Sequence, residues 1–216
     1  GGRGESIMMG LTTVISIVLA VGIFILLPYF LSSLLSDYVR NASLLAIVEG
    51  VIRILIFFLY VVGISLMKDI RRLYQYHGAE HKCINCIEKG RPLTVKNVMR
   101  SSRYHKRCGT SFMFFVMFVS IILFFFIRVP NPVMKVAVRI LLIPVIAGIS
   151  YEIIRLAGRS DNILVQILSL PGALLQRLTT KEPDESMVEV AMKSVEAVFD
   201  WKAYLRENFG YGAEEE

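Results

Sequence analysis

The chain has 216 residues, of which 55% are hydrophobic, and its mean hydropathy is positive. This composition excludes an ordinary soluble globular domain, and several apolar blocks reach the roughly 20 residues that cross a hydrocarbon core. The net charge of +6 is concentrated in one segment. We therefore expect an all-α integral membrane protein with about four transmembrane helices.

The first two predicted spans form an antiparallel hairpin. Leu11 to Leu35 is the first, with a bend expected at Pro28, and Leu44 to Met67 is the second. The second span carries Glu49 and Arg53 one helical turn apart. Charges at membrane depth pair with each other or face a polar cavity, whereas charges near the surface reach out to water. The sequence leaves both interpretations open.

A basic loop follows at residues 68–111. It has eleven lysines and arginines between Lys68 and Arg107 but only three acids. By the positive-inside rule this loop is cytoplasmic, and with four crossings both termini are cytoplasmic too. Lys68 to Tyr76 should continue the second helix out of the membrane, and Leu93 to Arg103 should form a short amphipathic helix. The charge favours contact with membrane lipids, anionic ones included. Without interleaved aromatic residues, nucleic acid is not expected as a partner.

Two more spans, Phe112 to Ile127 and Val133 to Ile154, form a second hairpin, and Pro144 should kink the last helix. Ile163 to Leu178 is apolar but too short for a fifth span, and Pro171-Gly172 interrupts it. We expect a re-entrant or interfacial hairpin there.

The C-terminal part contains an amphipathic stretch from Glu185 to Leu205, which should form one helix on the cytoplasmic surface. The chain therefore divides into four parts: the lead and first hairpin (1–67), the basic loop (68–111), the second hairpin (112–157), and the interfacial hairpin with the C-terminal helix (158–216).

His77, Glu80 and His81 form an H-x-x-E-H motif in the basic loop. The chain contains only three histidines, and two histidines four positions apart on a helix can reach one metal ion. Glu80 could then accept a proton from a water that the metal activates, as in the inverted form of the metalloprotease motif. The alternative is an exposed polar helix start. We favour a site for zinc or another divalent metal.

Three residues are candidates for a third ligand. His105 and Cys108 precede the third span, and Glu152 lies near the end of the fourth, which antiparallel packing returns to the same side. Three protein ligands would leave a position open for water, as catalytic zinc sites do. Cys108 could instead act as a nucleophile, because nearby basic residues lower the pKa of a thiol. Thr110 or Ser111 could cap the third span.

A competing ligand set uses the cysteines. Cys83 and Cys86 have the same spacing as His105 and Cys108, and the gap between the pairs is close to that of a zinc ribbon. This closed site would fold the loop without catalysing a reaction, and a merged site drawing on both clusters is also open. A ribbon needs β-knuckles, whereas Cys83 directly follows a predicted helix, so we favour the catalytic type.

Several segments resemble one family: Tyr76 to Lys82, Asn85-Cys86, His105 to Phe112, Tyr151-Glu152 and Leu178 to Asp184. They are similar to the YqhQ-type family of bacterial membrane proteins, whose members are described as candidate metal-dependent enzymes with a domain of unknown function. The resemblance implies a multi-pass protein of the bacterial inner (plasma) membrane. It implies functional roles for His77, Glu80, His81, Cys86, His105, Cys108 and Glu152. It does not require Cys83, and it leads us to expect a soluble segment before the first span.

Two hypotheses from different classes follow. The first is a metal-dependent membrane hydrolase at the cytoplasmic interface, with His77 and His81 as ligands and Glu80 as general base, acting on a peptide bond or a lipid-type ester. The second is a non-catalytic membrane scaffold or partner-binding protein whose loop is folded by structural zinc. The substrate, the protein partner and the oligomeric state, a homo-oligomer included, stay open.

Overall fold

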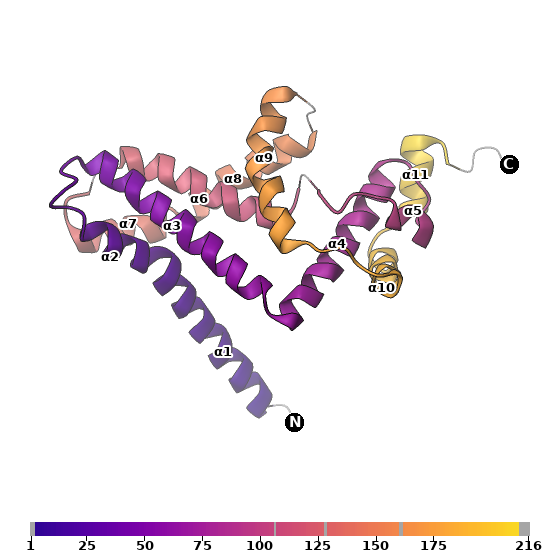
Figure 1. Ribbon diagram of the computed structural model, residues 1–216, viewed down its shortest axis with the longest axis horizontal. Helices are drawn as coiled ribbons and strands as arrows, with labels where there is room; N and C mark the ends of the chain where they lie inside the picture. Colours follow the sequence, from indigo (N-terminus) through magenta and orange to yellow (C-terminus); the bar gives the residue numbers. More distant parts are fainter. Residues whose placement is uncertain (1–2, 106, 128, 160–161, 212–216) are drawn as a thin grey trace. The chain divides into compact units, whose positions relative to one another are not determined.

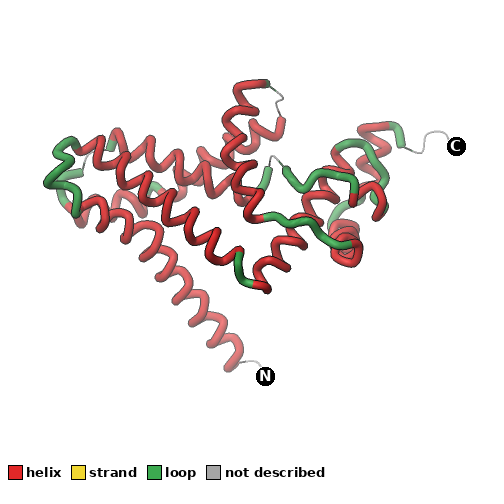
Figure 2. The backbone as a smooth tube through the Cα atoms, in the orientation of Figure 1, coloured by secondary structure: helices red, strands yellow, loops and turns green. Residues whose placement is uncertain are grey.

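The computed structural model describes residues 3–105, 107–127, 129–159 and 162–211. Within these ranges the elements are helices joined by short loops, without a strand (Figure 2). In the same part of the chain, three helical stretches are long and apolar enough to cross a membrane: Gly4–Ser33, Ala42–Ser65 and Gly109–Phe126. A bent pair, Pro132–Leu141 with Ile143–Arg159, makes up to a fourth. The protein is an all-α membrane protein, as the apolar blocks predict.

The chain forms two compact units. Unit 1 contains residues 1–60 and 115–150, and unit 2 contains residues 61–114 and 151–216. All three histidines and all three cysteines belong to unit 2.

Unit 1 begins with an apolar helical stretch made of α1 (Arg3–Val21), the π-helix η1 (Gly22–Leu26) and α2 (Leu27–Ser33), shown in indigo in Figure 1. Pro28 stands in the first turn of α2. Proline lacks an N–H and clashes with the carbonyl four residues before it, and a wider π turn accommodates both defects. The regular α-helix is therefore interrupted just before Pro28, as expected.

The other helices of unit 1 are α7 (Pro132–Leu141) and the parts of α3 (Ala42–Ser65), α6 (Gly109–Phe126) and α8 (Ile143–Arg159) that fall within its bounds. Asn131 caps α7 by accepting hydrogen bonds from the next two available backbone N–H groups. α7 and α8 meet at an angle of 42°, which confirms the kink predicted for the last span.

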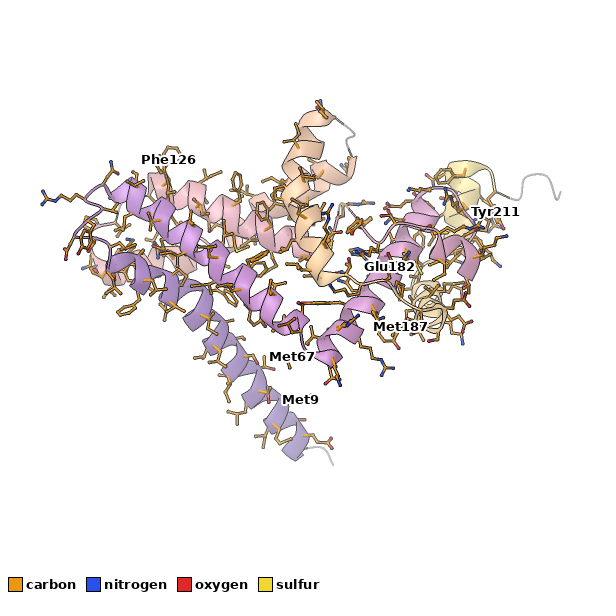
Figure 3. The ribbon with its side chains drawn as sticks, in the orientation of Figure 1. Met9, Met67, Phe126, Glu182, Met187 and Tyr211 are labelled. Carbon is orange, nitrogen blue, oxygen red and sulfur yellow. The ribbon has the colours of Figure 1, made fainter. Side chains whose placement is uncertain are left out.

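Unit 2 holds α4 (Lys68–Glu88), α5 (Val95–Met99), α9 (Ile163–Thr179), α10 (Glu185–Glu196) and α11 (Trp201–Phe209). The prediction that the second span continues unbroken into the loop is wrong. α3 ends at Ser65, and Met67, labelled in Figure 3, has extended backbone before α4 begins. The helix is therefore interrupted at Leu66 and Met67.

One face of α4 forms the core of unit 2. Ala79, Cys83, Cys86 and Ile87 recur at the spacing of a helix face and are buried. They pack with side chains from the segment after α4 and from α5, α10 and α11: Leu93, Val98, Val188, Ala191, Trp201 and Leu205. Burial of these apolar side chains fixes α4 against the C-terminal helices.

The hairpin predicted for residues 163–178 is not formed. α9 runs through Pro171 as one helix. The following Gly172 lies against Ser111 of α6, and an added Cβ would be 2.7 Å from the Ser111 Oγ. The Pro-Gly pair therefore allows close helix packing, at the expense of one helical hydrogen bond, and does not make a turn.

The amphipathic stretches are also shorter than predicted. The helix expected over 185–205 is divided into α10 and α11, because Asp200 accepts a hydrogen bond from Ala203 N at 2.9 Å and caps a new helix. The division lets Trp201 enter the core while its Nε1 donates to Glu196 at 3.1 Å. The helix expected over 93–103 is reduced to α5.

Candidate metal centre

The face of α4 opposite the core carries His77 and His81. The two rings are one helical turn apart, with their centroids separated by 4.4 Å. His81 is buried and His77 is partly buried. The helical spacing thus places both imidazoles together, as the motif predicts.

Both rings are oriented by backbone carbonyls. His77 Nδ1 lies 2.9 Å from the Thr179 carbonyl oxygen, and His81 Nδ1 lies 2.7 Å from the carbonyl oxygen of Arg103. A carbonyl can only accept, so each Nδ1 carries the proton and donates it. In the neutral ring each Nε2 then keeps its lone pair, which is the orientation that outer-shell carbonyls give to metal-binding histidines.

The Thr179 carbonyl is available because Thr179 ends α9, where the last carbonyls have no partner within the helix. The chain then crosses α4, and Lys181 N donates to the Tyr74 carbonyl oxygen at 2.9 Å. It passes directly over Gly78, where an added Cβ would lie 2.1 Å from the Lys181 carbonyl oxygen. Gly78 is therefore required for the segment that orients His77.

Cys108 completes the cluster from the start of α6. Its carbonyl accepts a hydrogen bond from Phe112 N at 3.0 Å, and its Sγ lies 3.4 Å from Thr110 N. Cys108 thus occupies the capping position that Thr110 or Ser111 was predicted to fill, and that prediction is wrong. The Sγ also lies 3.4 Å from His77 Nε2.

These neighbours change the ionisation of both groups. Burial raises the pKa of Cys108, but hydrogen bonds from His77, His81 and Thr110 outweigh it and lower the pKa to about 5. The hydrogen bond to Cys108 raises the pKa of His77, against the effect of burial. Without a metal, the thiolate form of Cys108 and the protonated form of His77 therefore stabilise each other.

His77, His81 and Cys108 offer ligand atoms that all lie within 4.8 Å of one another. Among the residues that the structure describes, no other histidine, cysteine or carboxylate group of three or more is this close. Tetrahedral zinc, with bonds of about 2.3 Å to sulfur and 2.0 Å to nitrogen, separates these ligands by roughly 3.5 Å. The distance of 3.4 Å between the Cys108 Sγ and His77 Nε2 fits a divalent metal.

The other predicted positions lie outside this cluster. His105 is close to His81, with ring centroids 5.7 Å apart, but its Nε2 is 3.3 Å from Glu88 Oε2. Glu152 is exposed and pairs with Arg155 at 3.3 Å. Glu80 is exposed beside His77.

Cys83 and Cys86 lie on the core face of α4. Burial raises the pKa of both thiols, that of Cys83 to about 12. The Cys86 Sγ lies near the carbonyls of Arg91 and Pro92, at 3.7 and 3.5 Å. The two cysteines do not join His105 and Cys108 in the described residues, so the zinc-ribbon arrangement is not assembled.

Sequence reasoning missed several residues that hold the site in place. Gln176 is buried; its Oε1 accepts from His105 N at 2.9 Å, and its Nε2 donates to the His105 carbonyl at 2.7 Å. Lys82 Nζ donates to the carbonyls of Met99 and Ser101, each at 3.0 Å, and fixes the loop that contains Arg103. Lys82 lies in the family-like segment Tyr76 to Lys82, where we assigned it no role, whereas Gln176 lies just before the family-like segment 178–184 and no sequence signal marked it.

A groove of about 520 Å³ runs beside the cluster. His77 and Glu80 line it from α4, and mostly apolar side chains line it from the same helix, from α10 and from the turn after α10: Leu73, Tyr74, Tyr76, Val190, Ala191, Ser194, Val195 and Val198. The groove therefore gives an apolar surface next to one ring of the histidine pair.

Comparison with known proteins identifies the family. The family described as "Protein of unknown function (DUF1385)" matches residues 2–201. The chain belongs to this family. It is 37% identical over 197 residues to "Uncharacterized protein YqhQ" of Bacillus subtilis (strain 168), which covers 90% of this chain. The chain spans 62% of the length of that relative. No solved structure matches it.

Proposed function

We propose that this protein is a metal-dependent hydrolase whose site lies at the membrane surface. His77, His81 and Cys108 would hold zinc or another divalent metal. The observation that supports this most is the pair of carbonyl-bound Nδ1 atoms, which leaves two Nε2 atoms close to one thiolate. When bound, the metal supplies a Lewis acid and lowers the pKa of a water molecule. Three protein ligands are the number found in catalytic zinc sites.

The neighbouring groove supports a hydrolase with a partly apolar substrate. Glu80 stands on its wall beside His77 and is proposed to take the proton of the attacking water. The apolar side chains of the groove would bind an acyl chain or a hydrophobic side chain beside the scissile bond. The substrate class is a lipid-type ester or a peptide bond.

The proposed location is the bacterial inner membrane, with the site and both termini in the cytoplasm. Two observations support it. The site lies in the basic loop, which the positive-inside rule assigns to the cytoplasm. The chain is also 37% identical, over 197 residues, to a relative from Bacillus subtilis.

The metal content of the purified protein tests the ligand set. Elemental mass spectrometry should find about one equivalent of metal in wild type and little in His77→Ala or Cys108→Ala. His105→Ala is the matched control, because it removes the third histidine, which lies outside the cluster, and should keep the metal. Metal-free wild type that takes up no zinc on titration would overturn the proposal, as would equal metal loss in the control.

The role of Glu80 needs a separate measurement. Glu80→Gln should keep the metal and reduce hydrolysis of a panel of lipid-type esters and peptides by about 100-fold or more. A non-catalytic scaffold with structural zinc would show no hydrolysis in wild type and no effect of the substitution on metal content or partner binding.

A thiol hydrolase is the second candidate, favoured by the Cys108 pKa of about 5 and its contact with His77. The thiolate would attack the substrate carbonyl and form a thioester, His77 would protonate the leaving group, and water would then release the acid. A chelator separates the two mechanisms. The metal-dependent enzyme loses activity and regains it with added zinc, whereas the thiol enzyme keeps its activity.

A further inference from the structure

A second polar cluster lies within unit 1, among its apolar helices. Glu49 and Arg53 on α3 are 3% and 8% exposed, and Arg139 on α7 is 4% exposed. Glu49 Oε1 is 3.0 Å from Arg53 Nη2, and its Oε2 is 2.6 Å from Arg139 Nη2. Arg53 Nη1 donates to Ser120 Oγ of α6 at 2.9 Å. Glu49 and Arg53, the charged pair noted in the second predicted span, are therefore part of a buried network.

This network has more positive than negative charge. Within the described residues Glu49 is the only acid that pairs with Arg53 or Arg139. Lys135, one turn before Arg139, lies over the same Tyr29 ring, at 5.1 Å for its Nζ against 5.2 Å for the Arg139 Cζ. Two guanidinium groups thus pair with one carboxylate, and the Lys135 ammonium group lies beside one of them. In addition, the buried Arg139 Nη1 and Arg53 Nε have no hydrogen-bond partner among the residues that the structure describes.

A cavity of about 330 Å³ adjoins the network. Lys135 and Arg139 line its cationic side, and the remaining lining is apolar, including Ala46, Phe124 and Ile127. Ala46 belongs to the first turns of α3 and Phe124 to the last turn of α6. The cavity is therefore at the ends of two membrane-spanning helices, where lipid headgroups meet the hydrocarbon core. Figure 3 labels Phe126 at this end of α6.

We propose that this cavity binds the phosphate headgroup of an anionic membrane lipid. The phosphate would face Lys135 and Arg139 and balance the excess positive charge, since guanidinium and ammonium groups both bind phosphate oxygens. The apolar lining would contact the glycerol and the first methylene groups. A buried cation without a counterion is unfavourable, which is why a charged ligand suits this cavity better than an apolar one. The site belongs to unit 1 and does not depend on the proposed hydrolase function.

Native mass spectrometry of the detergent-purified full chain tests this proposal. The protein is titrated with phosphatidylglycerol, phosphatidylcholine and, as a soluble source of the same phosphate group, glycerol phosphate. Wild type should bind one phosphatidylglycerol at least tenfold more tightly than phosphatidylcholine and should bind glycerol phosphate weakly.

Three variants locate the binding. Lys135→Gln removes a lining cation, and Ala46→Leu fills the cavity without changing charge, so each should reduce the preference for phosphatidylglycerol at least fivefold. Arg40→Gln is the matched control: Arg40 is exposed two residues before α3, and its loss changes the net charge by the same amount. It should leave binding unchanged, and thermal melting should show that all three variants are folded.

The other outcomes overturn the proposal. Equal affinity for the two lipids, or an equal loss in Arg40→Gln, would show that surface charge alone attracts the lipid. Glycerol phosphate binding as tightly as the lipid would show that the ligand is a soluble phosphate. If Lys135→Gln does not fold, Ala46→Leu still decides the outcome.

Discussion

The two faces of α4 show how differently one residue type behaves in adjacent environments. Cys83 and Cys86 on the core face and Cys108 beside the opposite face are all buried. Nevertheless the pKa of Cys83 is raised to about 12, whereas that of Cys108 is lowered to about 5. Burial is common to both, so the donors that surround Cys108 make the difference.

This comparison separates structural from chemical cysteines. Metal binding and nucleophilic attack both need the thiolate, and the core thiols stay protonated at neutral pH. Only Cys108 has two imidazoles and a helix N–H directed at its sulfur. Three cysteines in one loop therefore do not form one site.

The largest expected effect is in thiol reactivity. In metal-free protein at pH 7, we expect iodoacetamide to modify Cys108 roughly 100-fold or more faster than Cys83 or Cys86, because the thiolate is the reacting form. Peptide mass spectrometry of timed samples measures the three rates. His77→Ala should slow the modification of Cys108 by removing its donor. Equal rates for the three thiols would contradict the difference in pKa between Cys108 and the two core cysteines.

A smaller effect is expected from Gly78→Ala. The added methyl collides with the Lys181 carbonyl and displaces the Thr179 carbonyl from His77, which should weaken zinc binding about 10- to 100-fold. Competition with a chromogenic chelator measures the affinity. Gly63→Ala is the control, since an added Cβ there meets nothing within 4 Å. Unchanged affinity in Gly78→Ala would mean that the carbonyl does not matter.

The pH dependence of stability is a further test of the difference in pKa between Cys108 and Cys83. The pKa of Cys108 falls from an ordinary value near 9 to about 5 on folding, so its stabilising effect is complete above pH 9, decreases below it, and is absent below pH 5. His77 acts in the opposite direction, because its raised pKa stabilises at low pH and is lost as the pH rises through it. Between pH 6.5 and that raised pKa, the contribution of Cys108 to stability increases with pH while that of His77 decreases.

Thermal melting of the metal-free protein from pH 4 to 10 checks this expectation. The melting temperature of wild type relative to Cys108→Ser should be constant below pH 5, increase from pH 5 to 6.5, change little between pH 6.5 and the raised pKa of His77, and increase again toward pH 9, because the substitution also removes the group that raises the pKa of His77. The difference for Cys83→Ser should not change from pH 5 to about 8, since that thiol is protonated in both states there, and should fall at higher pH, where the thiol ionises only in the unfolded chain. A flat difference for Cys108→Ser would contradict the lowered pKa.

The smallest effects concern the support of the loop. Lys82→Met leaves two backbone carbonyls without their donor and should destabilise the protein by about 1–3 kcal/mol. Glu182, labelled in Figure 3, is 62% exposed and pairs with Lys82 and Arg103. Glu182→Gln should cost less than about 1 kcal/mol, because exposed ion pairs contribute little. Denaturant titration measures the free energy of unfolding of both variants. An equal decrease in the two variants would contradict the small contribution expected of the exposed Glu182 carboxylate.

Much of this fold follows from local pattern. The spans were predicted because membrane helices need about 20 apolar residues, and the histidine pair because four-residue spacing places two side chains on one face. Breaks inside helices were harder to predict. α9 continues through Pro171, and the next residue, Gly172, packs against Ser111. A new helix starts after Asp200, and its first residue, Trp201, packs into the core.

The third member of the cluster could not be singled out from the sequence. Cys108, His105 and Glu152 were equal candidates. Glu152 lies on α8, and for Cys108 and His105 the distance to His77 depends on the path of the loop between α4 and α6. That path is set by contacts across about 20 residues, such as Asn85 Nδ2 donating to the carbonyls of Ser102 and Tyr104. The pairing of Glu49 with Arg139 also depends on a long-range contact, because the two residues are 90 positions apart in the sequence.

The contact between His77 and Thr179 also sets when the site can form. The two residues are 102 positions apart, so His77 is synthesised long before the carbonyl that orients it. Chains fold from the N-terminus as they emerge, and contacts between distant residues form late. A ribosome-bound chain that ends before Thr179 contains every candidate span yet lacks the carbonyl that orients the His77 ring. If the cluster holds the proposed metal, binding would therefore follow the synthesis of α9.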